Sequence, residues 1–212
     1  MKRGCFITFE GPEGAGKSTH LKRLADYLRG QGVAVLTTRE PGGTKLGETV
    51  RGLLQFDAAG ESPVPEAELL LFLASRAQIV NQVIRPALQA GTWVLCDRFC
   101  DSTFAYQGFG RGMDVARLRA LNEFATSGLY PDRTLLLDIP QNESRARVVG
   151  RQGPADRFEQ EQEAFHLRLA EGFRILARDE PRRFAVIDSS GPCDATAEAV
   201  LKAVAPLLIS RR

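Results

Sequence analysis

The sequence predicts an α/β fold in which helices flank a parallel sheet of five strands. Strand-like apolar segments alternate with amphipathic helical segments along the chain, which is the pattern of a doubly wound sheet. The segment 134–138 is apolar without alternation, as expected for a strand buried on both faces. The 212 residues contain no internal repeat and no long linker, so we expect one domain spanning 1–212.

Composition excludes several classes of partner. The chain is 43% hydrophobic and 25% charged, with a formal net charge of +2, which is ordinary for a soluble domain. That small net charge creates no field that would favour nucleic acid or a membrane surface. No apolar run is long enough to cross a membrane, and the N-terminus lacks the features of a secretory signal. We therefore expect a cytoplasmic protein with small-molecule partners.

The first half of the chain is expected to contain three of the strands. They cover 3–9, 33–38 and 92–96, where apolar or β-branched residues are bounded by breakers. Helices are expected over 18–29, 46–54 and 65–88. Pro65 suits the first position of the last helix, and Leu69, Phe72 and Leu73 begin its helical spacing. Breaker-rich or polar loops fill 39–44 and 57–65.

The second half repeats the alternation. An aromatic, glycine-rich region covers 99–112, and Asp114 is the expected N-cap of a helix through 124. Strands follow at 134–138 and 184–188, with helices from 142 and over 194–208. A further helix is expected to carry the apolar residues Phe158, Phe165, Leu169, Phe173 and Leu176. Ligands of such sheets bind beyond the carboxyl ends of the strands, so we expect the functional residues there.

The strongest motif directly follows the first strand. Residues 11–19 satisfy G-x-x-x-x-G-K-[ST] in a strand, loop and helix context, which predicts a P-loop NTPase core that binds a nucleoside triphosphate. Its glycines allow backbone N–H groups to converge on phosphate oxygens. Lys17 is expected to reach the β- and γ-phosphates, and Ser18 to ligate Mg²⁺. The expected ATP-binding loop consists of Gly11, Pro12, Glu13, Gly14, Ala15, Gly16, Lys17, Ser18 and Thr19.

A charged pair follows the third strand. Asp97 stands where P-loop proteins place the carboxylate that supports Mg²⁺, so we assign it to the metal together with Ser18. Arg98 beside it is better suited to phosphate, because a planar guanidinium binds phosphate oxygens in a bidentate manner.

Together these motifs resemble those of thymidylate kinase. The phosphate loop, the segments Thr38–Thr44 and Asp97–Phe99, and the segment Ser102–Gly108 occur in the order and spacing of that family, over nearly the whole chain. The resemblance implies transfer of a phosphoryl group from ATP to dTMP, giving dTDP for dTTP biosynthesis, with Mg²⁺ and on a homodimer. It also implies a monophosphate-binding region at about 39–76 and a lid at about 145–157.

The resemblance assigns roles on the acceptor side. Phe72 and Arg76 lie four apart and share a helix face, where the family stacks the Phe on thymine and bonds its carbonyl with the Arg. Glu13 is expected to accept from the sugar 3′-hydroxyl rather than act on the magnesium side. The expected dTMP site consists of Glu13, Arg39, Arg51, Phe72, Arg76, Arg98, Ser102, Tyr106 and Gln107. Arg39, Arg51 and Arg98 serve its phosphate, and the Tyr106 ring would exclude a 2′-hydroxyl.

The lid is expected to supply positive charge to the transferred phosphoryl group. Pro12 and Ala15 of the phosphate loop are uncharged, so the chain resembles the bacterial type, in which lid arginines have that role. Arg151 is the first candidate and Arg147 the second, and Arg145 is expected near ATP. The expected catalytic residues are Lys17, Arg98, Arg39, Arg151 and Arg147.

Two other functions are weaker alternatives. A deoxynucleoside kinase on the same core would need a carboxylate base near the acceptor hydroxyl, for which Glu40 is the nearby candidate. A GTPase switch is suggested only by Asp57-Ala58-Ala59-Gly60, which follows a helix rather than a buried strand. The chain also lacks an N-K-x-D motif to read guanine.

Overall fold

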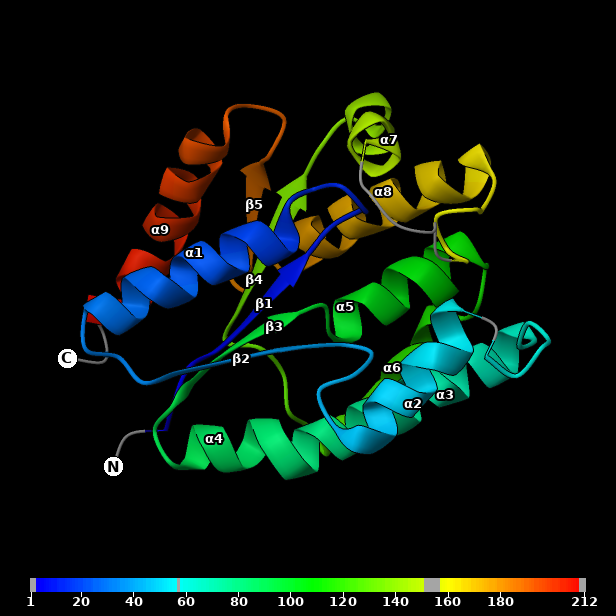
Figure 1. The fold of residues 1–212 in the computed structure, drawn as a ribbon, viewed down its shortest axis with the longest axis horizontal. Coiled ribbons are helices and arrows are strands. Elements are labelled where there is room, and N and C mark those ends of the chain that lie inside the picture. Colours follow the sequence, from blue (N-terminus) through cyan, green and yellow to red (C-terminus); the bar gives the residue numbers. More distant parts are fainter. Residues whose placement is uncertain (1–2, 57, 151–156, 210–212) are drawn as a thin grey trace.

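Five parallel strands form the centre of the computed structural model, which describes residues 3–56, 58–150 and 157–209 (Figure 1). Their order across the sheet is β2-β3-β1-β4-β5. The α/β fold with a five-stranded parallel sheet is therefore confirmed. The strands are β1 (Phe6–Glu10), β2 (Val35–Arg39), β3 (Trp93–Asp97), β4 (Arg133–Asp138) and β5 (Phe184–Asp188).

The register aligns the carboxyl ends of the inner strands. Arg39 of β2 pairs with Asp97 of β3, and Phe9 of β1 pairs with the same Asp97 from the other side. The chain leaves β1 into the phosphate loop and leaves β3 into Arg98. Because parallel strands end at one edge, the segments that follow β1, β2 and β3 meet there.

Helices cover both faces of the sheet (Figure 1). The helices α1 (Lys17–Gly30) and α9 (Cys193–Ile209) cover one face, where Ile7 and Phe9 pack with Leu24 and Val200. On the other face Phe6 of β1 belongs to a larger core. That core is formed with α3 (Pro65–Ile79), α4 (Arg85–Gln89), α6 (Val115–Thr126) and α8 (Glu163–Asp179).

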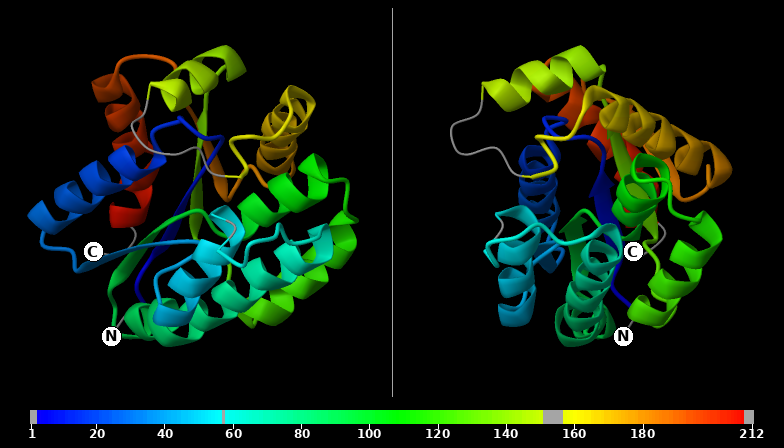
Figure 2. Two further views of the ribbon diagram at one scale, coloured as in Figure 1. Left: turned by 45° about the vertical axis from the view of Figure 1, so that its right-hand side comes forward. Right: turned by 90° about the vertical axis from the view of Figure 1, so that its right-hand side faces the viewer.

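Three further helices lie around the carboxyl edge of the sheet. They are α2 (Lys45–Gln55), which packs on α3, α5 (Cys100–Thr103) and α7 (Gln141–Val149). Figure 2 shows α7 at the top of both views, above the loop that joins β1 to α1. Within the described ranges, no helix is long and apolar enough to cross a membrane.

Two segments differ from the sequence expectation because of helix geometry. The single helix expected over 65–88 is interrupted by a π-helical segment, η1 (Val80–Ile84), before α4. Pro86 lies in that region, and its missing N–H and bulky ring disturb a regular α-helix. The glycine-rich region forms α5 followed by the π-helical segment η2 (Phe104–Gly110). A Cβ at Gly110 would lie 2.5 Å from the Phe165 ring, so glycine allows this close approach.

The placement of Phe158 on a late helix was wrong. That helix, α8, begins at Glu163, and Phe158 lies in the turn before it. Phe158 fits the apolar spacing of α8, but its ring packs against Tyr106, with centroids 5.6 Å apart, and is 4% exposed. The spacing therefore reflected a tertiary contact rather than a helix face.

Candidate active site

The phosphate loop adopts a conformation that its glycines make possible. Gly11, Gly14 and Gly16 have φ values of +133°, +73° and +86°. A Cβ at Gly11 would lie 2.3 Å from the carbonyl oxygen of Leu137, and one at Gly14 would lie 2.6 Å from that of Ser144. The N-terminus of α1 has no side-chain cap. Its N–H groups are therefore oriented to bind an anion.

Lys17 and Ser18 both line the cleft beyond the loop but bond different partners. The buried Lys17 ammonium donates to the carbonyl oxygens of Gly11 and Pro12, at 3.1 and 2.7 Å, and so folds back over the loop. Burial lowers the pKa of Lys17, and the nearby Arg98 lowers it further. The Ser18 hydroxyl donates to Asp97 Oδ2 at 2.6 Å. The sequence-predicted metal pair is therefore brought together.

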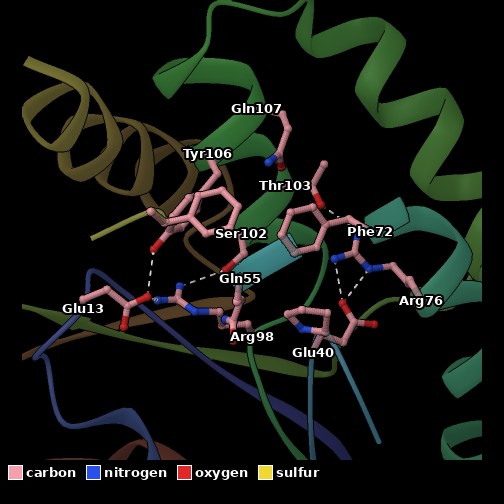
Figure 3. Close-up of a pocket in the computed structure, with 12 residues that line it drawn as sticks. Glu13, Glu40, Gln55, Phe72, Arg76, Arg98, Ser102, Thr103, Tyr106 and Gln107 are labelled. Carbon is pink, nitrogen blue, oxygen red and sulfur yellow. Dashed lines mark hydrogen bonds and ion pairs between the residues drawn. The ribbon is translucent and has the colours of Figure 1, made fainter. Parts of the chain in front are cut away.

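Arg98 occupies a backbone conformation that few non-glycine residues adopt, with φ at +69°. Its guanidinium donates to the Gly11 carbonyl and to the Ser102 hydroxyl, each at 3.1 Å, and pairs with Glu13 (Figure 3). It also lies 5.1 Å from the centroid of the Tyr106 ring. Backbone strain held by so many contacts is typical of functional sites.

Glu10 at the end of β1 fixes the turn that carries Arg98. One oxygen of this buried carboxyl accepts from the Phe99 backbone N–H at 2.7 Å, and the other accepts from the Ser102 hydroxyl at 2.6 Å. Burial, and then the charge of Asp101, raises the pKa of Glu10. Sequence analysis assigned Glu10 no role, because a charged residue at a strand end has no distinctive pattern.

Glu13 faces the aromatic side of the loop. It accepts from the Tyr106 hydroxyl at 3.3 Å and pairs with Arg98, while Lys17 lies 4.0 Å away (Figure 3). Burial raises the pKa of Glu13, but the charges of Arg98 and Lys17 outweigh it and bring the pKa to about 2. Glu13 is therefore a fixed negative charge between two cations.

Basic side chains surround an open cleft beyond the phosphate loop, with a volume of about 1230 Å³. Arg39 and Arg51 come from β2 and α2. Arg39 pairs with Glu48 at 2.8 Å, and Arg51 donates to the Pro41 carbonyl at 3.2 Å. The cleft is lined by Glu13, Gly14, Gly16, Lys17, Ser18, Thr19, Arg39, Glu40, Arg51, Gln55, Phe56, Asp97, Arg98 and Arg147.

An aromatic pocket of about 410 Å³ opens beside this cleft (Figure 3). The rings of Phe72 and Tyr106 form walls of the pocket, and Phe158 contacts both of them, at 5.9 and 5.6 Å between centroids. Its lining residues are Glu13, Glu40, Pro41, Gln55, Phe72, Arg76, Arg98, Ser102, Thr103, Tyr106, Gln107 and Phe158. Phe72 and Arg76 face the same pocket, as their spacing predicted.

Arg76 lines the pocket but is almost completely shielded from solvent. It is 1% exposed, and its Nε donates to Glu40 Oε2 at 2.8 Å. The two terminal nitrogens donate to Thr103, Asn122 and the Phe99 carbonyl, and one also pairs with Glu40. Burial raises the pKa of Glu40, and the charge of Arg76 opposes that rise. The Arg76–Glu40 pair therefore forms a rigid pocket floor.

The three arginines predicted for the lid region differ in where they lie. Arg147 lines the phosphate cleft and donates to the Ser190 carbonyl at 3.2 Å. Arg145 instead lines a separate hollow between α7 and α8, which Pro12 and Glu13 of the phosphate loop also line. Arg151, the preferred candidate for the transferred phosphoryl group, lies outside the described residues. The structure thus brings Arg147 to the cleft but not Arg145.

Sequence reasoning missed several groups that line or support the two cavities. Gln55 lines both cavities, and within the described residues its buried Oε1 has no hydrogen-bond partner. The Ser144 hydroxyl of α7 donates to the Glu13 carbonyl at 2.7 Å, which joins the lid helix to the phosphate loop. Lone Gln and Ser residues have no sequence signature, so only the folded chain identifies them.

The two cavities share four lining residues: Glu13, Glu40, Gln55 and Arg98. A group that occupies the aromatic pocket can therefore extend an anion into the basic cleft. There it would meet a second anion held by the phosphate loop. This arrangement suits the joining or transfer of a phosphoryl group between two bound phosphates.

Comparison with known proteins points to one family. The family model described as thymidylate kinase matches residues 9–200. The thymidylate kinase of Nitratidesulfovibrio vulgaris is 50% identical over 209 residues, covering 96% of this chain and 97% of that one. That of Desulfovibrio desulfuricans is 53% identical, covering 88% of each. A crystal structure of thymidylate kinase from Ehrlichia chaffeensis matches with a TM-score of 0.78 and 37% identity, covering 96% and 99% of the two chains.

Proposed function

The chain belongs to the thymidylate kinase family, and on that premise we propose that it transfers the terminal phosphoryl group of ATP directly to dTMP. The product, dTDP, serves dTTP synthesis. The observation that carries this proposal is the junction of the aromatic pocket with the basic cleft at Glu13 and Arg98. One cavity suits a flat base and the other suits phosphates, so a nucleoside monophosphate fits across the junction.

The phosphate loop holds the donor. Backbone N–H groups of the loop, which its residues other than Pro12 carry, surround the β- and γ-phosphates together with the Lys17 ammonium. Phosphoryl transfer needs little covalent help from the protein, so positioning and charge supply most of the acceleration. Lys17 is buried and fixed by two carbonyl oxygens, so its charge needs little reorganisation during transfer.

The Ser18–Asp97 pair fits magnesium. Within the described part of the chain, no cluster of three or more His, Cys, Asp or Glu side chains could hold a metal alone. Mg²⁺ commonly uses one or two protein oxygens and completes its shell with water and phosphate oxygens, which is what this pair can offer. When bound, the ion would neutralise part of the phosphate charge.

The acceptor dTMP occupies the pocket and the near side of the cleft. Phe72 stacks on the base from the 39–76 region, Arg76 and Gln107 bond its polar edge, and Tyr106 lies against the sugar. Glu13 accepts from the 3′-hydroxyl, a role supported by its position beside Tyr106. Arg39, Arg51 and Arg98, with Ser102 beside Arg98, hold the acceptor phosphate.

Charge between the two phosphates comes from Arg98 and the lid, which covers 145–157. The acceptor phosphate is an anion, so it attacks without a general base. Arg147 is the lid arginine supported by its place in the cleft, and Arg151 keeps the assignment made from sequence. We also propose that the chain forms a homodimer through α3 and α6, which pack together and carry the exposed side chains Leu70 and Phe124.

A substrate panel tests the function. The purified chain is assayed for ADP release with ATP, Mg²⁺ and either dTMP, dUMP, dCMP or thymidine, and the product is identified by chromatography. We expect the highest kcat/KM with dTMP and dTDP as the product. Turnover of thymidine alone would instead indicate a deoxynucleoside kinase. The Glu40 position disfavours that outcome, because the carboxyl is paired with Arg76 rather than placed as a base.

A further inference from the structure

Glu68 of α3 is a completely buried carboxylate without a role in the transfer described above. Four N–H groups converge on it. Arg111 approaches with two nitrogens, at 2.7 Å from Oε1 and 2.9 Å from Oε2, and Arg157 bonds Oε2 as well. The fourth donor is the Gln107 amide, whose Nε2 lies 2.8 Å from Oε1. A buried carboxylate with this many partners is a costly arrangement that requires an explanation.

The two arginines determine how the Glu68 oxygens can form hydrogen bonds. Guanidinium groups only donate, so both oxygens of the Glu68 side chain must act as acceptors. A group that bonds the remaining lone pair must therefore donate as well. The Gln107 amide can satisfy this requirement in one orientation only, with its nitrogen toward Glu68 and its oxygen away from it.

The Gln107 oxygen is thereby directed to the pocket. Gln107 is 1% exposed to solvent and lines the aromatic cavity, and Figure 3 shows its side chain reaching toward the space between the rings of Phe72 and Tyr106. Among the described residues, no hydrogen bond to the Gln107 side-chain oxygen is found. An acceptor thus faces the position that the proposed function gives to the base.

We propose that Glu68 is a positioning residue that locks the Gln107 amide with its oxygen toward the base, and so selects a base whose edge carries an N–H. This inference rests on the proposed function. Thymine and uracil carry a hydrogen on N3, whereas N3 of cytosine is a bare acceptor. A fixed acceptor opposite cytosine N3 leaves two lone pairs facing each other, and buried unpaired polar groups give strong discrimination.

The substitution Glu68→Gln tests the lock. The amide at position 68 can keep its oxygen on Arg157 and on the terminal nitrogen of Arg111, losing the bond from Arg111 Nε. Its nitrogen then faces Gln107, which rotates and presents its own nitrogen to the base. We expect the ratio of kcat/KM for dTMP to that for dCMP to fall about tenfold or more. The ratio for dTMP to dUMP should stay constant, because both bases carry the N3 hydrogen.

Glu161→Gln is the matched control. Glu161 accepts from the same Arg111 at 2.8 Å but, in the described part of the chain, forms no hydrogen bond with Gln107, so its substitution perturbs the guanidinium without releasing the amide. Both substrate ratios should equal those of the unmodified chain. A purely structural role for Glu68 would instead lower kcat/KM for dTMP, dUMP and dCMP by the same factor, and that result would overturn the proposal.

Gln107→Met keeps the test decisive if Glu68→Gln folds poorly. It removes the amide and leaves the Glu68 carboxylate with both arginines, and the dTMP to dCMP ratio should fall as before. Adding Glu68→Gln to Gln107→Met should not lower the ratio further, because both act through one group. An additive effect would contradict the lock. Absence of dTMP turnover in the unmodified chain would instead refute the proposed function itself.

Discussion

The base pocket and the phosphate cleft adjoin one another, yet they hold their arginines in opposite ways. In the pocket, Arg76 is 1% exposed and bonds four residues from different segments. In the cleft, the Arg39 side chain is 51% exposed and pairs with one exposed carboxylate, Glu48. Arg39 stands at the end of β2 and Arg76 stands near the end of α3, but only Arg76 is buried.

The proposed function accounts for this difference by what each cavity would bind. A flat base is recognised by shape and by a few polar groups, so those groups must be fixed before it arrives. Phosphates carry negative charge that moves between donor and acceptor during transfer. Exposed guanidinium groups can change position as that charge moves. The comparison predicts that pocket substitutions reduce stability and cleft substitutions reduce turnover.

Arg76→Ala should produce the largest effect, and it should act on stability. It leaves the buried Glu40 carboxyl without its cation, so we expect the free energy of unfolding to fall by about 3–5 kcal/mol. Urea denaturation followed by circular dichroism measures it. Arg23→Ala is the control, because the Arg23 pair with Asp194 is solvent-exposed and its loss should leave the free energy of unfolding nearly unchanged. Equal losses in the two variants would remove the distinction between pocket and surface.

Lys17→Ala should produce the largest effect on turnover. Loss of the fixed charge at the phosphate loop should reduce kcat by about 10²–10³, or about 3–4 kcal/mol of transition-state stabilisation. Steady-state assays with dTMP and ATP measure it. Lys22→Ala, at an exposed position on the same helix, should leave kcat unchanged. Near-normal kcat in Lys17→Ala would contradict the donor role of the loop.

Arg39→Ala should separate binding from folding within the cleft. We expect kcat/KM for dTMP to fall about 10–100-fold, because a charge-assisted bond to phosphate is lost. The free energy of unfolding should change by less than about 0.5 kcal/mol, since the Arg39–Glu48 pair is exposed. An altered KM for ATP with an unchanged KM for dTMP would place Arg39 on the donor side.

Glu13→Gln should give the smallest effect, a change in how the free energy of unfolding depends on pH. The Glu13 pKa of about 2 lies below its ordinary value of 4.5, so the contribution of this carboxylate to stability is present above pH 4.5 and is lost as the pH falls toward 2. The side chain is 24% exposed, so solvent screening limits the contribution to about 1 kcal/mol. Glu13→Gln should therefore lose less stability between pH 5 and pH 3 than the unmodified chain does. Parallel pH curves for the two proteins would contradict the assigned pKa.

Much of this protein was predictable from local pattern. The phosphate loop, the strand order in the chain and the Asp114 cap depend on spacing and residue type over a few positions, and the structure confirms each. The shared face of Phe72 and Arg76 followed from helix periodicity. Phe158 was misplaced because an apolar residue at helical spacing can serve a contact outside the helix.

The fold class, the anion-binding loop and the set of arginines around it could be predicted from sequence alone, because these depend on local chemistry and periodicity. Packing, in contrast, determines which arginines are buried and which stay exposed, and it brings Gln107, Arg111 and Arg157 together at Glu68. Those contacts join residues from α3, from η2 and the position directly after it, and from the turn before α8. Burial and convergence depend on packing between distant segments, which no local pattern records.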